Sequence, residues 1–147
     1  MKWVLPLVLA GCTTAATLPR VDIPLRNPTA PIASQADVTL KRLAGEWIVV
    51  SGAGLAPGTR VRVTAKTLEL DGVALALADT GEGRLLVGGD PVWVHWLDIG
   101  NRTAALGDPN GSRVWIMDRT GAPGDRLAAA RKILTWYGYD LDRMSGA

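Results

Sequence analysis

The fold is decided by the stretch Arg60-Val61-Arg62-Val63-Thr64 and its continuation, Leu68-Glu69-Leu70-Asp71-Gly72-Val73-Ala74-Leu75-Ala76-Leu77. Strict alternation places Val61 and Val63 on one face of a strand and the arginines on the other. The dipeptide Asp71-Gly72 is a strong signal for a two-residue hairpin turn, because both central residues of that turn need positive φ. An antiparallel pair of strands is therefore expected around this turn.

The same pattern continues on both sides of the hairpin. Residues 60–64, 68–70 and 73–77 supply three strands, and five more apolar or alternating runs are expected at 46–50, 84–87, 91–98, 102–106 and 113–117. No helical pattern separates these runs, which favours an antiparallel meander, and eight such strands can close into a barrel without free edges. One helix is expected from Gly124 to about Tyr137, with Gly138 just after its end. The sequence therefore predicts an all-β protein, a small up-and-down eight-stranded antiparallel β-barrel with a C-terminal helix packed outside.

The N-terminus has the composition of an export signal. After Lys2, the apolar run from Trp3 to Leu9 is too short to cross a bilayer, and it ends in Leu9-Ala10-Gly11-Cys12, which contains the sole cysteine. This segment resembles a bacterial lipoprotein signal. The resemblance implies cleavage before Cys12, acylation of its thiol, and membrane attachment. Thr13, rather than Asp, at the second mature position implies the outer membrane, facing the periplasm.

Three parts are therefore expected along the chain. Residues 1–11 are the signal peptide, residues 12–36 carry the acylated cysteine and a tether, and residues 37–147 form the barrel domain. The tether is predicted from four prolines among polar residues without apolar periodicity, a composition that favours an extended spacer.

Charge and titratable residues exclude several classes of function. The chain has 16 basic and 14 acidic residues, a net charge of +2, which gives no reason to expect a nucleic acid partner. His95 is the only histidine, and it is expected to be a surface or packing residue rather than a metal ligand or a catalytic base. Asp118 is expected at a solvated strand end. No enzyme, metal or cofactor is predicted, and a monomer is the default expectation.

Three segments resemble the lipocalin family. Gly45-Glu46-Trp47 is similar to its Gly-x-Trp signature, and Gly107-Asp108-Pro109-Asn110 with Val114-Trp115-Ile116-Met117-Asp118-Arg119-Thr120 resembles the last hairpin and strand of bacterial lipocalins. Gly138-Tyr139-Asp140-Leu141 resembles the segment after their helix. The turn Asp98-Ile99-Gly100-Asn101 lacks the usual tyrosine, and the domain is short, which implies a shallower cup.

The resemblance assigns a structural role to Gly45, Trp47 and Arg119. It implies that the arginine of the last strand lies over the tryptophan of the first strand and closes the barrel floor. A guanidinium over an indole contributes roughly 0.5–2 kcal/mol.

The resemblance, with the alternation of side chains in a barrel, also implies a set of pocket residues. Trp93 and His95 are expected to face outward, and the side chains expected to face inward are those of Val92, Val94, Trp96, Thr103, Ala105, Arg113, Trp115 and Met117. An apolar ligand would suit them, with Arg113 meeting a carboxylate or phosphate at the rim. Alternatively, the large side chains fill the interior as core, and a slip of one residue exchanges the two faces.

Three functions remain open on the sequence. The first is a lipid-anchored carrier of a small hydrophobic ligand of the fatty acid or lysophospholipid class. The second is an envelope protease inhibitor, a class of small barrels that insert a free N-terminal strand. The third is a ligand-free docking lipoprotein, which a filled interior and an exposed apolar patch would favour. The aromatic cluster Trp136-Tyr137-Gly138-Tyr139 either seals the helix against the barrel or leans on a membrane surface.

Overall fold

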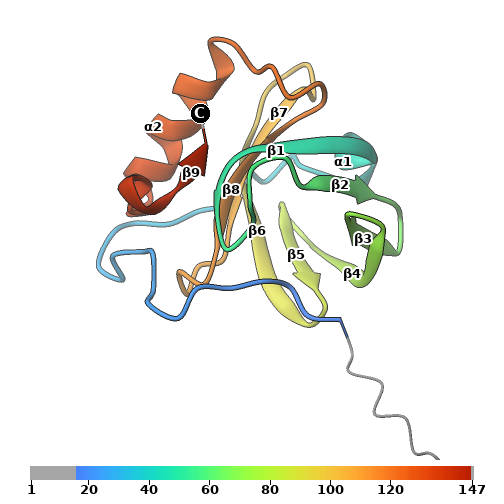
Figure 1. Ribbon diagram of the computed structural model, residues 1–147, viewed down its shortest axis with the longest axis horizontal. Coiled ribbons are helices and arrows are strands. Elements are labelled where there is room, and N and C mark those ends of the chain that lie inside the picture. The colour runs from blue at the N-terminus through green and yellow to red at the C-terminus, as the bar shows by residue number, and fades with distance from the viewer. Residues whose placement is uncertain (1–15, 147) are drawn as a thin grey trace, which may run out of the picture.

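The computed structural model describes residues 16–146, whose main feature is a closed barrel of eight antiparallel strands (Figure 1). The strands are β1 (Gly45–Ala53), β2 (Arg60–Val63), β3 (Thr67–Leu70), β4 (Val73–Gly81), β5 (Arg84–Val87), β6 (Asp90–Leu97), β7 (Thr103–Gly107) and β8 (Val114–Asp118). Each strand pairs with the next along the chain, and β8 pairs with β1 to close the barrel. The predicted up-and-down barrel is confirmed.

The hairpin between β3 and β4 has the predicted turn. Asp71 has φ 48° and Gly72 has φ 85°, and Leu70 pairs with Val73 across the turn. Both turn residues therefore occupy the positive-φ region that the Asp-Gly dipeptide favours.

Buried side chains form two apolar clusters, one on each side of the barrel wall. The inner cluster fills the barrel and includes Trp47, Leu75, Val87, Trp115 and Met117. The outer cluster lies between the strands and the C-terminal segments, and its members include Leu25, Val50, Ala105, Ile116 and Leu134.

The predicted helix packs outside the barrel, as Figure 1 shows. It is α2 (Arg126–Trp136), and it buries Ala130 and Leu134. Two short elements that the sequence did not indicate follow it, η1 (Leu141–Arg143) and β9 (Ser145–Gly146), and β9 pairs with β1.

One end of the barrel, here called the floor, is closed by a short helix and a stacked pair. The Nε1–H of Trp47 donates to the carbonyl of Leu43, at the end of α1 (Leu40–Leu43), over 2.8 Å. The guanidinium carbon of Arg119 lies 3.7 Å from the centroid of the Trp47 ring. Arg119 also donates to the carbonyls of Arg42, Ala44 and Asn101 at 2.7–2.9 Å. The predicted structural pair is confirmed.

The N-terminal segment packs against the barrel, which corrects the prediction of a tether for its described part. Leu18 and Leu25 are 3% and 2% exposed, respectively. The backbone N–H groups of Val21, Leu25, Asn27 and Gln35 donate to carbonyls of Ser112, Gly111, Gly138 and Val94, each over 2.8 Å. Its two buried leucines and these hydrogen bonds hold the segment on the surface of the barrel. The folded unit therefore begins well before residue 37.

Among residues 16–146, no helix has both the length and the hydropathy of a membrane span. The expected signal peptide and the expected acylation at Cys12 lie outside the described residues.

Candidate functional site

The end of the barrel opposite the floor, here called the mouth, carries the turns β1–β2, β3–β4, β5–β6 and β7–β8. Two buried leucines close it. Leu55, 2% exposed, comes from the β1–β2 loop, and Leu18 comes from the N-terminal segment; both belong to the inner cluster. We call residues 17–26 the strap, because they run along this end of the barrel (Figure 1). The apolar interior is therefore covered at the mouth by a loop and a strap.

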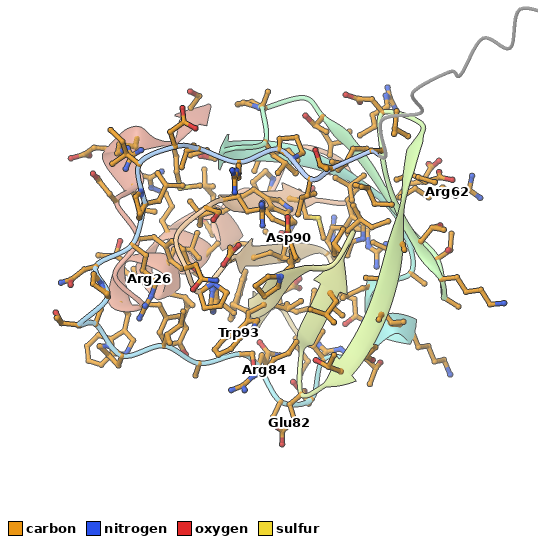
Figure 2. The ribbon with its side chains drawn as sticks, turned by 90° about the horizontal axis from the view of Figure 1, so that it is seen from below. Arg26, Arg62, Glu82, Arg84, Asp90 and Trp93 are labelled. Atoms are coloured by element: carbon orange, nitrogen blue, oxygen red, sulfur yellow. The ribbon has the colours of Figure 1, made fainter. Side chains whose placement is uncertain are left out.

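Arg113 is a charged residue that lies buried at the mouth, and its side chain is only 1% exposed. Nη1 donates to Asp108 over 2.9 Å, Nη2 donates to Asp90 over 3.3 Å, and Nε donates to the carbonyl of Pro19 in the strap over 2.8 Å. Figure 2 views the barrel from this end, with Asp90 near the middle. The Asp108 side chain is 4% exposed and that of Asp90 is 46% exposed. One cation thus faces two carboxylates and one neutral strap carbonyl.

Close packing of the β1–β2 loop explains why Gly54 precedes Leu55. Gly54 has φ 87°, and a Cβ there would lie 2.9 Å from the Cβ of Arg113. A side chain at position 54 would therefore strain the loop and displace Arg113.

Half of the predicted pocket residues face the interior as core. Val92, Val94, Trp115 and Met117 are fully buried in the inner cluster. The indole Nε1–H of Trp115 lies 3.4 Å from the sulfur of Met117. These side chains fill the barrel. Trp115 and Met117 are therefore core residues, as the alternative interpretation of the sequence predicted.

Trp96, Thr103 and Ala105 lie on the outer face, which corrects their predicted direction. The pairing of β6 with β7 shifts between Val94 and Trp96, so that Trp96 pairs with Ala105 and Leu97 pairs with Ala104. This irregularity adds one residue to β6, and both His95 and Trp96 then point outward. Trp96 and Ala105 accordingly belong to the outer cluster beneath α2.

Thr103 binds Asp118 on this outer face. Its hydroxyl donates to Asp118 over 2.6 Å and accepts from the Nε of Arg126 over 2.8 Å. Asp118 is 1% exposed, so the expected solvated strand end is wrong. Burial alone would raise the pKa of Asp118, but hydrogen bonds from Thr103, Thr120 and Ala122 leave it below the usual value. Asp118 is thus a structural acceptor that fixes the turn after β8.

His95, on β6, is buried against the N-terminal and C-terminal segments, so of the two expected roles, surface or packing, it has the packing role. Its Nδ1 lies 2.6 Å from the carbonyl of Ala33, which can only accept, so the neutral ring carries its proton there. Its Nε2 lies 2.8 Å from the hydroxyl of Tyr139. Burial lowers the pKa of His95 to about 4, against the raising effect of the Ala33 carbonyl, and Arg26 adds to the lowering. His95 therefore stays neutral at physiological pH and joins the N-terminal segment to the C-terminal one.

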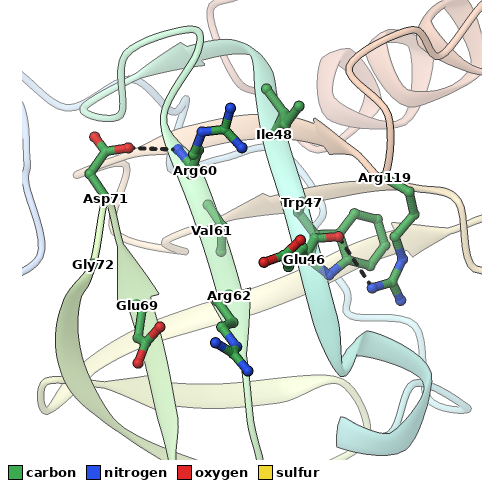
Figure 3. A pocket seen from close by; sticks show the side chains of 10 residues that line it. All are labelled: Glu46, Trp47, Ile48, Arg60, Val61, Arg62, Glu69, Asp71, Gly72 and Arg119. Atoms are coloured by element: carbon green, nitrogen blue, oxygen red, sulfur yellow. Dashed lines mark hydrogen bonds between the residues drawn. The ribbon is translucent and has the colours of Figure 1, made fainter.

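A depression of about 260 Å³ lies over β1, β2 and β3 on the outside of the barrel. Figure 3 shows Glu46, Arg62 and Glu69 in a row across these strands, in agreement with the pairing of Arg62 with both glutamates. Three cations and three carboxylates line this hollow: Arg60, Arg62, Arg119, Glu46, Glu69 and Asp71. Because the opposite charges balance, this surface has no excess charge to attract a polyanion.

Another hollow lies on the exposed side of α2, and an aromatic residue that does not pack against the barrel lines it. Trp136 is 69% exposed, whereas Tyr139 is 4% exposed against His95. Arg131 and Lys132 line the same hollow. The aromatic cluster is therefore divided, with Tyr139 sealing the chain against the barrel and Trp136 facing outward.

No protein-family model matches this chain, and no curated protein matches it. Among the described residues, no group of three or more His, Cys, Asp or Glu side chains is placed to hold a metal ion.

Proposed function

We propose that the protein is a lipid-anchored, lipocalin-like protein of the bacterial envelope that binds a small hydrophobic molecule at the barrel mouth. One observation carries the proposal: at the opening of an apolar interior, the buried Arg113 donates a hydrogen bond to the strap carbonyl of Pro19, a place that a ligand carbonyl can take. Concave apolar sites with a few polar groups at the opening are the usual form of small-molecule sites. The single acyl chain of a fatty acid or of a lysophospholipid fits such an apolar opening.

The filled interior limits the size of the ligand. Trp47, Trp115 and Met117 occupy the barrel, and Leu18 and Leu55 cover it. Room at the mouth arises when a covering side chain moves away. The ligand is therefore a single short chain, or the first part of a longer one.

The anchor belongs to the same proposal. Acylation of Cys12 rests on the resemblance of Leu9-Ala10-Gly11-Cys12 to a lipoprotein signal. Cys12 precedes Leu18 by six residues, which span at most about 22 Å when fully extended. An acylated Cys12 would thus keep the mouth close to the membrane surface, from which an apolar ligand comes.

Acylation is tested by metabolic labelling with a radioactive fatty acid. The full chain should incorporate the label and sediment with outer membranes, and Cys12→Ser should abolish both. Label that persists in Cys12→Ser would contradict the anchor.

Ligand binding is tested by native mass spectrometry of the protein purified gently from its own envelope. The proposal predicts a bound mass that can be removed and then restored by an added single-chain lipid. A protein that carries no mass and takes up no lipid of any head group would contradict it.

A second candidate is a docking lipoprotein that uses the exposed side of α2. It is favoured by the packed interior together with the exposed Trp136 beside Arg131 and Lys132, a combination suited to an anionic membrane surface. Flotation of the Cys12→Ser chain with vesicles rich in phosphatidylglycerol tests it. Binding that falls with Trp136→Ala, but not with Ile99→Ala at the fully exposed Ile99, would support docking. Absence of flotation would exclude it.

The protease-inhibitor alternative receives no support from the N-terminal segment. An inhibitor of that kind needs a free N-terminal strand, whereas Leu18 and Leu25 are buried and Val21 and Leu25 are hydrogen-bonded to the β7–β8 loop.

A further inference from the structure

The first part of the strap lies on the mouth in the manner of a bound ligand. We infer that Leu18 and Pro19 are an internal stand-in for the ligand, and that the molecule that replaces them is an uncharged acyl ester. This inference rests on the proposed binding function, and it adds the site, the competitor and the chemistry of the head group.

The contacts of residues 16–20 have two parts, one apolar and one polar. Leu18 is 3% exposed in the inner cluster, while residues 16, 17, 19 and 20 are exposed. The carbonyl of Pro19 accepts from the Nε–H of Arg113 over 2.8 Å. An apolar group beside a carbonyl oxygen is also the arrangement in an ester of a fatty acid.

Few contacts hold this part of the strap. Among the hydrogen bonds of the described residues, the one from Arg113 to Pro19 is the only one that involves residues 16–20. From Val21 onward the attachment is denser, with backbone bonds from Val21 to Ser112 and from Leu25 to Gly111. Residues 16–20 can therefore leave the mouth while the rest of the strap stays bound.

The charges at the mouth select a neutral head group. Arg113 already faces Asp108 at 2.9 Å and Asp90 at 3.3 Å, so these three side chains carry a net charge of −1. A carboxylate in the place of the Pro19 carbonyl would meet two like charges. A neutral ester carbonyl would accept the same hydrogen bond without that repulsion. The expectation that Arg113 meets a carboxylate or phosphate is replaced here by a neutral acceptor.

The strap competes with the ligand for the mouth. Only the molecules whose mouth is open can bind, so the apparent affinity equals the intrinsic affinity multiplied by the open fraction. A variant that loosens Leu18 should bind more tightly than the natural chain. In Leu18→Ala, three carbons are removed from the part of the strap that enters the mouth.

The experiment is calorimetric titration of the full chain, carrying Cys12→Ser, with glycerol monooctanoate and with octanoate at pH 8. The two probes share one acyl chain and differ in the charge of the head group. We expect the ester to bind weakly to the chain with the natural strap. It should bind about tenfold more tightly to the Leu18→Ala variant. Ile23→Ala is the matched control, because Ile23 lies in the same strap and is 70% exposed. The affinity of this variant for the ester should equal that of the natural chain.

The head-group inference is tested by Asp90→Asn. The Asp90 side chain is 46% exposed, so the neutral amide should be tolerated. Octanoate should bind this variant more tightly than the natural chain, while the affinity for the ester stays the same. If octanoate binds the natural chain as well as the ester does, the selection of a neutral head group is wrong.

Displacement is measured without any strap variant by limited proteolysis with trypsin. Arg20 is exposed beside Leu18, so the ester should speed cleavage after Arg20, while cleavage after the partly buried Arg26 stays slow. The strap inference is overturned if the ester binds the natural chain and a folded Leu18→Ala variant equally well and does not change cleavage after Arg20. The proposed binding function would still stand after that result. No binding of either probe to any variant overturns both.

Discussion

The floor and the mouth of this barrel are each closed around an arginine, but the two arginines hold different partners. At the floor, Arg119 stacks on Trp47 and donates to backbone carbonyls in and beside the barrel elements. At the mouth, Arg113 binds two carboxylates and one carbonyl of the strap. The floor is therefore part of the barrel structure, whereas the mouth is closed by a segment that can be exchanged.

The same difference appears along the N-terminal segment. Residues 27–36 are held by His95, which binds the Ala33 carbonyl, and by Gln35, which exchanges hydrogen bonds with β6. Residues 16–20 are held by the Leu18 side chain and one hydrogen bond. A segment can thus be firmly attached at one end and separable at the other.

The largest expected effect is at the floor. Trp47→Ala should lower the free energy of unfolding by about 3–5 kcal/mol, because it removes a fully buried indole and the surface on which Arg119 stacks. Urea unfolding followed by circular dichroism measures it. The control, Trp136→Ala at an exposed site, should change it by less than about 0.5 kcal/mol. Equal losses would show that Trp47 has no special role in closing the floor.

The second effect concerns the attachment of residues 27–36 through His95. The folded-state pKa, about 4, lies below the ordinary value of 6.5, so the unfolded chain binds more protons between these values. This contribution to stability is complete above about pH 7 and is lost as the pH falls from 6.5 to 4, with a total of about 3 kcal/mol. Urea unfolding at several pH values measures it. His95→Gln should remove this part of the pH dependence, and an unchanged pH profile in that variant would refute the assignment.

The third effect compares two buried leucines, one at each end of the barrel. Leu43 at the floor is 1% exposed and Leu18 at the mouth is 3% exposed. Leu43→Ala should cost about 3 kcal/mol of global stability, in the usual range for a buried leucine. Leu18→Ala should cost less than about 1 kcal/mol, because a strap that opens on its own contributes little to global unfolding. Equal losses in paired urea titrations would mean that the strap unfolds only with the barrel.

The sequence was sufficient for the strands of the barrel, because the signals there are local. Alternation in residues 60–77, the Asp71-Gly72 turn and the short apolar runs each report directly on strand structure. The Trp47–Arg119 stack came from the family resemblance and is present.

The mouth depends on features that alternation does not encode. The irregularity between Val94 and Trp96 moves Trp96 to the outer face. The alternation of residues in β6 does not indicate that the strand contains an added residue. The strap was missed because its buried leucines, Leu18 and Leu25, are seven residues apart among prolines and polar residues. An isolated apolar residue in an extended segment has no periodicity to reveal its burial.

The hydrogen bonds of Arg113 also lay beyond the sequence. Asp108 lies five residues before Arg113 in the sequence, whereas Asp90 and the Pro19 carbonyl meet Arg113 only through the closed barrel and the strap. The electrostatics of the site therefore depend on tertiary structure.

The most direct test of a separable mouth on a fixed floor is native-state hydrogen exchange of the unliganded chain. The Nε–H of Arg113, which donates to the carbonyl of Pro19 in the strap, should exchange by a local opening of much lower free energy than global unfolding. The amide of Arg119, which donates to the Arg102 carbonyl beside the floor, should exchange only with global unfolding. Protection of the Arg113 Nε–H equal to that of the Arg119 amide would contradict the account, because the first part of the strap would then be an inseparable part of the barrel.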